Sequence, residues 1–188
     1  MSKVIALIAG AFKPYTAGHH YLVSSAAETA DQVLLFVSNR DRARPGELPI
    51  MWNNSMELIW KNYIEDILPP NVKVKYVPTP VRAIYEYLVA ADQKSTDNLY
   101  VVYSDAEDMA MNYSPASLKK YFPNLTKNKK IKLRPMERGV DSPNVSGTML
   151  RSILAAGNVE KFSKFLPVQL QSKGKQIANL LLKPKRAR

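Results

Sequence analysis

Apolar, strand-like runs alternate with stretches of helical periodicity along most of the chain. Val4–Ala9 and Gln32–Ser38 are nearly unbroken apolar runs, as strands covered on both faces require. Val72–Val77 alternates like a strand with one wet face, Leu99–Tyr103 predicts another strand, and Ile131–Leu133 a short fifth. This alternation predicts right-handed crossovers and an α/β fold, a Rossmann-like open parallel sheet with helices on both faces.

The intervening stretches carry apolar residues three and four positions apart. Met56–Ile67 follows this spacing and is closed by Pro69-Pro70, and Ala83–Ala91 follows it as well. In open parallel sheets, ligands bind outside the carboxyl ends of the strands. We therefore expect the functional residues to lie just after the strands.

The chain has 188 residues, which suits one domain with a sizeable core. From Ser146 onward the pattern is helical only, and no linker divides the sequence. We expect a single domain over residues 1–188, with a helical C-terminal end at about 146–182 and a basic tail at 183–188.

Composition excludes several classes of protein. There is no cysteine, and the two histidines are the adjacent His19 and His20, so disulfides and thiolate or multi-histidine metal sites are not expected. The net charge of +11 favours anionic partners, among them phosphorylated small molecules and nucleic acid. No run approaches the roughly 18–20 apolar residues of a membrane span, and the apolar start is too short for a leader, so we expect a cytoplasmic protein.

The first predicted strand is followed by a segment suited to an anion, Gly10–His20. Gly10 lets the backbone approach a ligand, and Gly18 and His19 fall where a helix should begin, where free N–H groups and the macrodipole favour negative charge. His19 can donate to a phosphate oxygen, and Lys13 lies on the same loop. The alternative is an ordinary strand-to-helix turn with incidental histidines.

A second segment, Asn144–Arg151, also opens a predicted helix. Ser146 and Thr148 offer hydroxyls there, and Arg151 follows Thr148 by three residues, on nearly the same helix face. Met149 stands where a capping box would have Glu or Gln. The segment therefore predicts a second anion site with a guanidinium beside it, suited to phosphate.

Together these segments resemble a known superfamily. Thr16-Ala17-Gly18-His19 resembles the [HT]-x-G-H signature, and Ser146–Arg151 the S-[GST]-[TS]-x-x-R signature, of the nucleotidylyltransferases. The chain is similar to archaeal-type nicotinamide mononucleotide adenylyltransferases and to small cytidylyltransferase-like proteins of tailed phages. It departs from the archaeal pattern, which has Arg in place of Ala11 and His in place of Thr16; phosphopantetheine adenylyltransferases use Thr there.

The resemblance implies one displacement, without a covalent intermediate, in which an acceptor phosphate attacks the α-phosphate of ATP or CTP and pyrophosphate leaves with the help of Mg²⁺. His19 would contact the α-phosphate, Lys13 would neutralise incoming phosphates, and Arg151 would hold the β- and γ-phosphates. No protein metal site is expected. The residues expected to contact the nucleotide are Gly10, Ala11, Phe12, Thr16, Gly18, Ser146, Gly147 and Thr148.

Three weaker sequence features indicate where the acceptor could bind. A polar loop follows the second predicted strand, an acidic segment follows the fourth, and a tryptophan could stack on a base. The alternatives are a solvated loop, a helix cap at the aspartate and core packing of the tryptophan. The acceptor contacts so indicated are Asn39, Arg40, Arg42, Asp105 and Trp52.

The favoured function is adenylyl transfer from ATP to a phosphorylated acceptor, with nicotinamide mononucleotide as that acceptor and NAD as the product. One alternative is a cytidylyltransferase acting on another acceptor. Another is a non-catalytic basic protein that binds nucleic acid or an assembly through the tail at 183–188, although no aromatic residue interleaves with those charges. The expected partners are nucleotides rather than nucleic acid or membranes, and relatives often form homo-oligomers.

Overall fold

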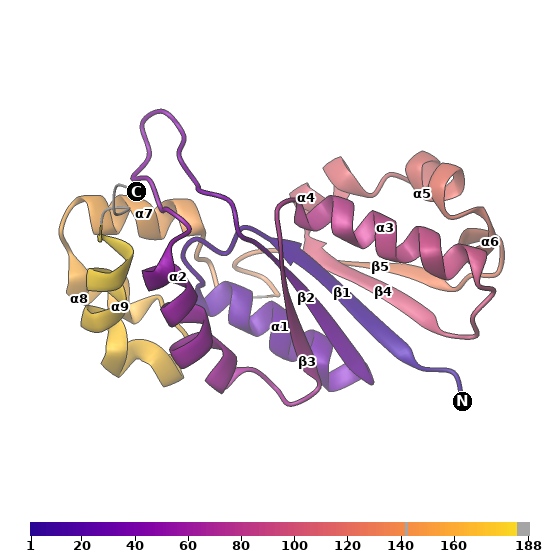
Figure 1. Cartoon of the computed structure of the whole chain (residues 1–188), viewed down its shortest axis with the longest axis horizontal. Helices are drawn as coiled ribbons and strands as arrows, with labels where there is room; N and C mark the ends of the chain where they lie inside the picture. Colours follow the sequence, from indigo (N-terminus) through magenta and orange to yellow (C-terminus); the bar gives the residue numbers. More distant parts are fainter. Residues whose placement is uncertain (142, 184–188) are drawn as a thin grey trace.

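The computed structural model describes residues 1–141 and 143–183, and it contains a five-stranded parallel sheet (Figure 1). The order across the sheet is β3-β2-β1-β4-β5, and every neighbouring pair is parallel. The predicted α/β fold with an open parallel sheet is therefore confirmed. The strands are β1 (Val4–Gly10), β2 (Gln32–Ser38), β3 (Val72–Val77), β4 (Leu99–Asp105) and β5 (Ile131–Met136).

The sheet alternates its side chains between two apolar clusters, one on each face. In β1, Ile5 and Leu7 belong to one cluster and Ala6 and Ile8 to the other, as the two-residue period of a strand dictates. Both faces of the central strands are thus buried, which explains why β1 and β2 are almost wholly apolar. β3 lies at an edge, where Lys73 and Lys75 reach solvent.

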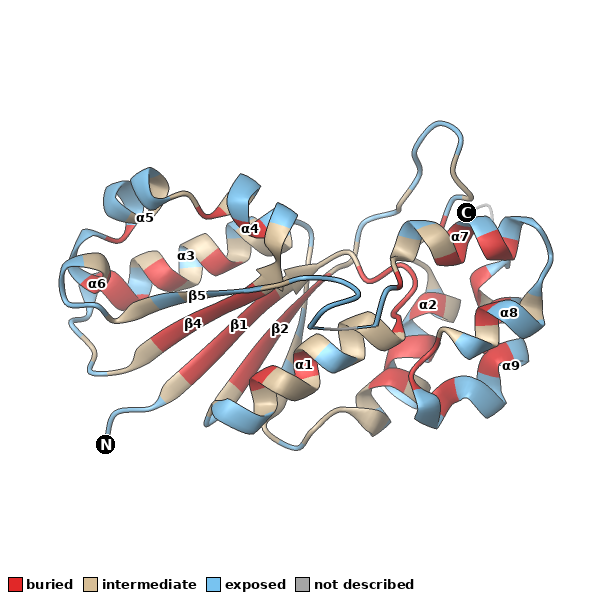
Figure 2. Ribbon diagram, turned by 180° about the vertical axis from the view of Figure 1, so that it is seen from behind, coloured by how far each residue is buried: buried red, intermediate tan, exposed pale blue. Residues whose placement is uncertain are grey.

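Helices cover both faces. One face carries α1 (Ala17–Thr29), and the other carries the crossover helix α3 (Pro80–Gln93) and a run of short helices (Figure 2). The sequence did not predict the short helices because five to seven residues show too little periodicity. These are α4 (Ala106–Asn112), α5 (Pro115–Tyr121) and α6 (Pro123–Lys127).

A helical group packs beyond the carboxyl edge of the sheet and extends the apolar cluster on the α1 face. The single helix expected at 56–67 is wrong in detail: it begins as an α-helix, continues as a π-helical segment at Trp60 and ends as a 3₁₀ turn. The group consists of α2 (Asn54–Ile59), η1 (Trp60–Ile64), η2 (Glu65–Ile67), α7 (Gly147–Ala155), α8 (Val159–Lys164), η3 (Val168–Lys173) and α9 (Gly174–Leu181).

The C-terminal helices are tied to the start of α1. The Ala17 N–H donates to the Phe165 carbonyl over 2.9 Å. This bond holds the end of α8 against the turn that leads from the sheet into α1.

In the described part of the chain, none of the helices is long and apolar enough to cross a bilayer. Most of the predicted basic tail, residues 184–188, lies outside the described residues.

Candidate active site

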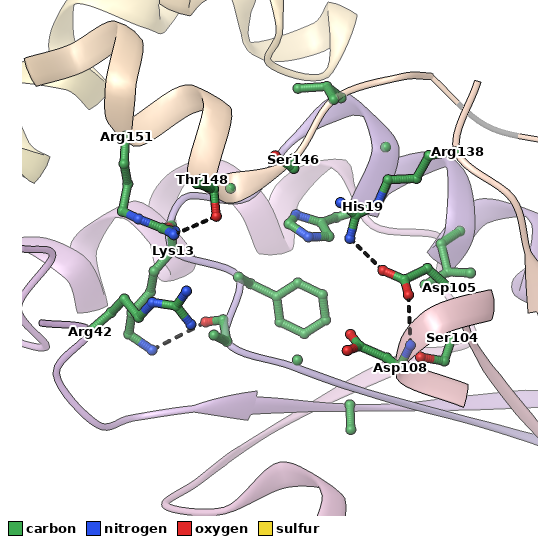
Figure 3. Close-up of a pocket in the computed structure, with 18 of the residues that line it drawn as sticks. Lys13, His19, Arg42, Ser104, Asp105, Asp108, Arg138, Ser146, Thr148 and Arg151 are labelled. Atoms are coloured by element: carbon green, nitrogen blue, oxygen red, sulfur yellow. Dashed lines mark hydrogen bonds and ion pairs between the residues drawn. The ribbon is translucent and has the colours of Figure 1, made fainter. Parts of the chain in front are cut away.

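A cavity of about 300 Å³ opens at the carboxyl ends of β1 and β4, where the fold class predicts ligand binding. Segments distant in sequence form its wall: the β1–α1 loop, the β2–α2 loop, the ends of β4 and β5, and the start of α7. His19 and Arg151 both line this one cavity, from opposite sides (Figure 3). The two motif segments thus meet as expected.

The turn after β1 requires a glycine and holds an aromatic ring under the cavity. A Cβ atom at Gly10 would lie 2.7 Å from Phe12 Cζ, so a larger residue would push the ring away. Phe12 itself has a φ of 50°, an uncommon backbone conformation for a bulky residue. Its ring meets the His19 imidazole edge to face, with centroids 4.9 Å apart.

Thr16 and His19 form a reciprocal cap at the start of α1. The His19 N–H donates to Thr16 Oγ1 over 3.2 Å, and the Thr16 N–H donates to His19 Nδ1 over 3.1 Å. Because Nδ1 accepts from a backbone N–H, it carries no proton, and the neutral ring bears its proton on Nε2. Thr16, expected to contact the nucleotide, is fully buried and does not line the cavity; it reaches the site only through its bonds to His19.

The imidazole of His19 is uncharged at neutral pH. Its pKa is lowered to about 4, mainly by burial and also by the neighbouring Arg138 guanidinium, while Asp105 opposes the shift. The side chain therefore offers a neutral N–H donor to the cavity instead of a positive charge.

The start of α7 is built against α1. Ser146 caps the helix, its Oγ accepting from the Met149 N–H over 3.1 Å. A Cβ atom at Gly18 would lie 3.2 Å from the Val145 carbonyl oxygen, so the two helix starts approach closely where Gly18 stands. Gly147 likewise leaves room for the Arg151 guanidinium, whose Nη1 would lie 3.1 Å from a Cβ atom there.

Arg151 is buried, with 4% of its surface exposed, and its donors are engaged. Nη1 donates to the Lys13 carbonyl over 2.8 Å and Nη2 to Thr148 Oγ1 over 2.9 Å. Nε and Nη2 also donate to the Glu47 carboxylate, over 3.1 and 2.7 Å. The sequence motif therefore fixes the place of Arg151 but gave no sign of its acidic partner.

Lys13 is more buried than its expected role requires. Its Nζ donates to the carbonyls of Ala11 and Ser38 and lies 5.2 Å from the centre of the Trp52 ring. Burial lowers its pKa to about 8. The ammonium of Lys13 thus links the loop after β1 to the end of β2 through hydrogen bonds to backbone carbonyls. The expected role of Lys13 in neutralising phosphates stays a prediction.

An ion pair closes the side of the cavity opposite Arg151. Asp105 caps α4 by accepting from the Asp108 N–H over 3.0 Å, which confirms the predicted cap, and its other oxygen accepts from Arg138 Nη2. Burial and the Asp105 charge raise the pKa of Asp108, which also lines the cavity. Asp108 belongs to the acidic segment expected after the fourth strand, although only Asp105 of that segment was named, and Arg138 was missed because it belongs to no motif.

The expected acceptor residues divide into two sets. Arg42 and Asp105 line the cavity, whereas Asn39, Arg40 and Trp52 do not. The Trp52 ring packs against Tyr76, 5.4 Å away, which corrects its expected place in the site. His20 also lies elsewhere, its Nδ1 3.3 Å from the Tyr15 hydroxyl.

A second hollow of about 320 Å³ adjoins the first across the end of β1. The two share Arg42, Ser104 and Asp108, and the second is lined further by Ser38 and the start of α3. A ligand with two parts, one in each hollow, would therefore span the carboxyl edge of the sheet.

Comparisons with known proteins show similarity over part or nearly all of the chain. The family model of the citrate lyase ligase C-terminal domain matches residues 5–67, and no curated protein matches the chain. A structure from Vibrio parahaemolyticus described as a nicotinate-nucleotide adenylyltransferase is 16% identical, with a TM-score of 0.60, covering 97% of this chain and 100% of that one.

Two further solved structures share the fold over only part of their own length. One is a bifunctional NMN adenylyltransferase/ADP ribose pyrophosphatase from Francisella tularensis, 12% identical with a TM-score of 0.59, covering 97% of this chain and 53% of that one. The other is Thermotoga maritima TmcAL bound with alpha-thio ATP, 14% identical with a TM-score of 0.53, covering 95% and 56%. The chain thus shares its fold with these three solved structures.

Proposed function

We propose that the chain is a nucleotidylyltransferase that transfers AMP from ATP to a phosphorylated acceptor and releases pyrophosphate. The observation that carries the proposal is the meeting of His19 and Arg151 in one cavity, together with two helix starts. Two solved structures with this fold are described as adenylyltransferases and a third holds an ATP analogue, which supports ATP as the nucleotide.

His19 is suited to the α-phosphate. Its Nδ1 is held by the Thr16 N–H, so Nε2–H can donate to an α-phosphate oxygen without the ring rotating. An acceptor phosphate oxygen forms a bond to the α-phosphorus while the bond to the bridging oxygen of pyrophosphate breaks, and both electrons of that bond leave with pyrophosphate. A neutral donor that is already positioned stabilises the charge developing on the α-phosphate.

The start of α7 is suited to the β- and γ-phosphates. The helix offers free N–H groups, Arg151 offers a guanidinium, and Arg42 and Arg44 line the same side of the cavity. We propose that Mg²⁺ enters with the nucleotide's phosphates and that Asp108, a carboxylate that lines the cavity, would contact it. When bound, the ion would neutralise phosphate charge.

We propose nicotinamide mononucleotide as the acceptor, placed in the second hollow. Support comes from two of the structures with this fold, which are described as acting on nicotinate nucleotide and on NMN. The second hollow adjoins the cavity at the end of β1 and extends toward the start of α3, which leaves room for an acceptor beside the nucleotide. The product of this reaction would be NAD.

The experiment is a measurement of pyrophosphate release from each of the four nucleoside triphosphates, with Mg²⁺ and a panel of phosphorylated acceptors. We expect turnover with ATP and nicotinamide mononucleotide that His19→Ala abolishes. His20→Ala is the matched control, because its ring lies outside the cavity, and it should keep full activity. Turnover with CTP and a different acceptor would replace the adenylyl assignment but keep the reaction class; no turnover on any pair would overturn the proposal.

A further inference from the structure

The loop between β2 and α2 places an acidic residue, Glu47, against Arg42 and Arg151, two arginines that line the cavity. Arg42 and Ile50 pair across the base of this loop, with two backbone hydrogen bonds of 2.8 Å. At the tip, the Glu47 N–H donates to the Arg44 carbonyl over 3.1 Å. The intervening Pro45 and Gly46, the latter with a φ of 78°, fit a type II turn. Backbone geometry therefore fixes where Glu47 stands in an otherwise exposed loop (Figure 2).

A single oxygen of Glu47 accepts from two arginines. Oε2 accepts from Arg151 Nη2 over 2.7 Å, from Arg151 Nε over 3.1 Å and from Arg42 Nε over 3.4 Å. About a quarter of the Glu47 side chain is exposed, against 4% of the Arg151 side chain. The Glu47 carboxylate thus lies on the solvent side of the buried Arg151 guanidinium.

A carboxylate and a phosphate present the same chemistry to a guanidinium, since both are anionic oxygens that accept its N–H groups. Burial alone would raise the pKa of Glu47, but the charges and hydrogen bonds of Arg151 and Arg42 outweigh it and lower the pKa, so the group stays ionised. A phosphate and Glu47 cannot both occupy these three N–H groups. Their charges would also repel at such close range.

We propose that Glu47 is an internal competitor of the nucleotide, occupying a terminal-phosphate subsite formed by Arg42 and Arg151 until a triphosphate displaces it. The inference rests on the proposed function and assigns Arg42 to the triphosphate instead of the acceptor. It makes Glu47 a specificity-determining residue. A ligand long enough to place a phosphate between the two arginines must expel Glu47, whereas a monophosphate held at His19 need not.

The test is isothermal titration of the full chain with three probes: inorganic tripolyphosphate, ATP and AMP. Glu47→Gln removes the charge but keeps the shape, and we expect it to bind tripolyphosphate and ATP about tenfold more tightly, since hydrogen bonds to a charged group are worth more than neutral ones. AMP should show no gain. Glu86→Gln is the matched control, because it removes the same charge from an exposed ion pair with Arg82 on α3, and it should change nothing.

A second variant tests the subsite itself. Adding Arg42→Gln to Glu47→Gln should cancel the gain, because one of the two guanidiniums is then missing. Unchanged or weaker binding of ATP by Glu47→Gln would overturn the inference and leave the proposed function standing, as would an equal gain for AMP or for Glu86→Gln. Failure of every protein to bind ATP or tripolyphosphate would overturn the inference and the proposed function together.

Discussion

The two helix starts that meet in the cavity differ in how their key side chains are held. At α1, the His19 ring is neutral, and its inner nitrogen accepts from the cap residue Thr16, which leaves the outer one for a ligand. At α7, the Arg151 guanidinium is charged, and Glu47, Thr148 and the Lys13 carbonyl take up its donors. One start presents an available donor, and the other presents a site that the chain itself fills.

This difference follows from the chemistry of the two side chains. A neutral imidazole can be buried with one backbone hydrogen bond, whereas a buried guanidinium needs an anion and several acceptors to offset its lost hydration. The charge that suits α7 to phosphates is therefore also the reason it needs a counter-ion from the protein. Catalytic positioning at α1 and charge recognition at α7 can be separated by mutation.

The largest effect is expected from Arg151→Ala. This change removes a buried guanidinium that donates to Glu47, to Thr148 and to the Lys13 carbonyl, so we expect a clear fall in the free energy of unfolding, with turnover below detection. Urea unfolding and pyrophosphate release measure the two effects. Arg82→Ala, which breaks only an exposed pair with Glu86, should alter neither. If Arg151→Ala were equally harmless, α7 would not be a phosphate site.

The His19→Gln variant separates the two roles of the His19 side chain, which are the capping of α1 and catalysis. Gln is a residue that the third helical position of a capping box accepts, so the stability of α1 should be kept, while loss of the ring should lower kcat about 10²- to 10³-fold. His19→Ala should lower both the stability of α1 and kcat. Thermal melts and steady-state kinetics on the two variants decide the matter: a His19→Gln protein with wild-type kcat would mean that the ring is only a cap.

Thr16→Ala should act through His19. We expect the free energy of unfolding to fall by about 1–2 kcal/mol from the lost cap, and kcat to fall about tenfold as the ring loses its orientation. KM for ATP should change little, since Thr16 does not line the cavity. Thr16→Ser keeps the hydroxyl and should restore kcat; a rise in KM with kcat unchanged would instead indicate direct contact with the nucleotide.

The smallest effect concerns Lys13, whose loop joins the two helix starts. Its folded pKa of about 8 lies below 10.5, the ordinary pKa of a lysine side chain. Between these values the unfolded chain holds a proton that the folded chain has lost, so stability should rise with pH. Relative to Lys13→Met, the wild type should gain less than about 1.4 kcal/mol from pH 8 to 9. If the free energies of unfolding of the wild type and Lys13→Met change in parallel over this range, burial does not lower the pKa of Lys13.

Much of the fold could be predicted from the sequence because strands covered on both faces must be apolar. The bounds of β2 and β3 match the predicted ones, whereas β4 and β5 run further, to Asp105 and Met136. Those extensions are polar or contain proline, and their strand conformation comes from pairing with a neighbour, which periodicity does not register.

In the site, sequence motifs predicted the residues whose backbone position matters and missed the ones that act as partners. His19 and Arg151 belong to recognisable helix starts, so their meeting was predictable. Glu47 and Arg138 lie in irregular loops, and only the folded chain brings Arg138 to the cavity and Glu47 against Arg151. The Thr16–His19 cap could have been predicted, because a threonine followed three residues later by a polar side chain has the spacing of a capping box.

The most direct measurement is a crystal structure of the chain with Mg²⁺ and a non-hydrolysable ATP analogue. We expect an α-phosphate oxygen within about 3 Å of His19 Nε2, and the terminal phosphate against Arg151 and Arg42 in the position that the Glu47 carboxylate now holds. A triphosphate bound elsewhere, with the His19 and Arg151 side chains free of phosphate contacts, would contradict the claim that the two helix starts form one nucleotide site.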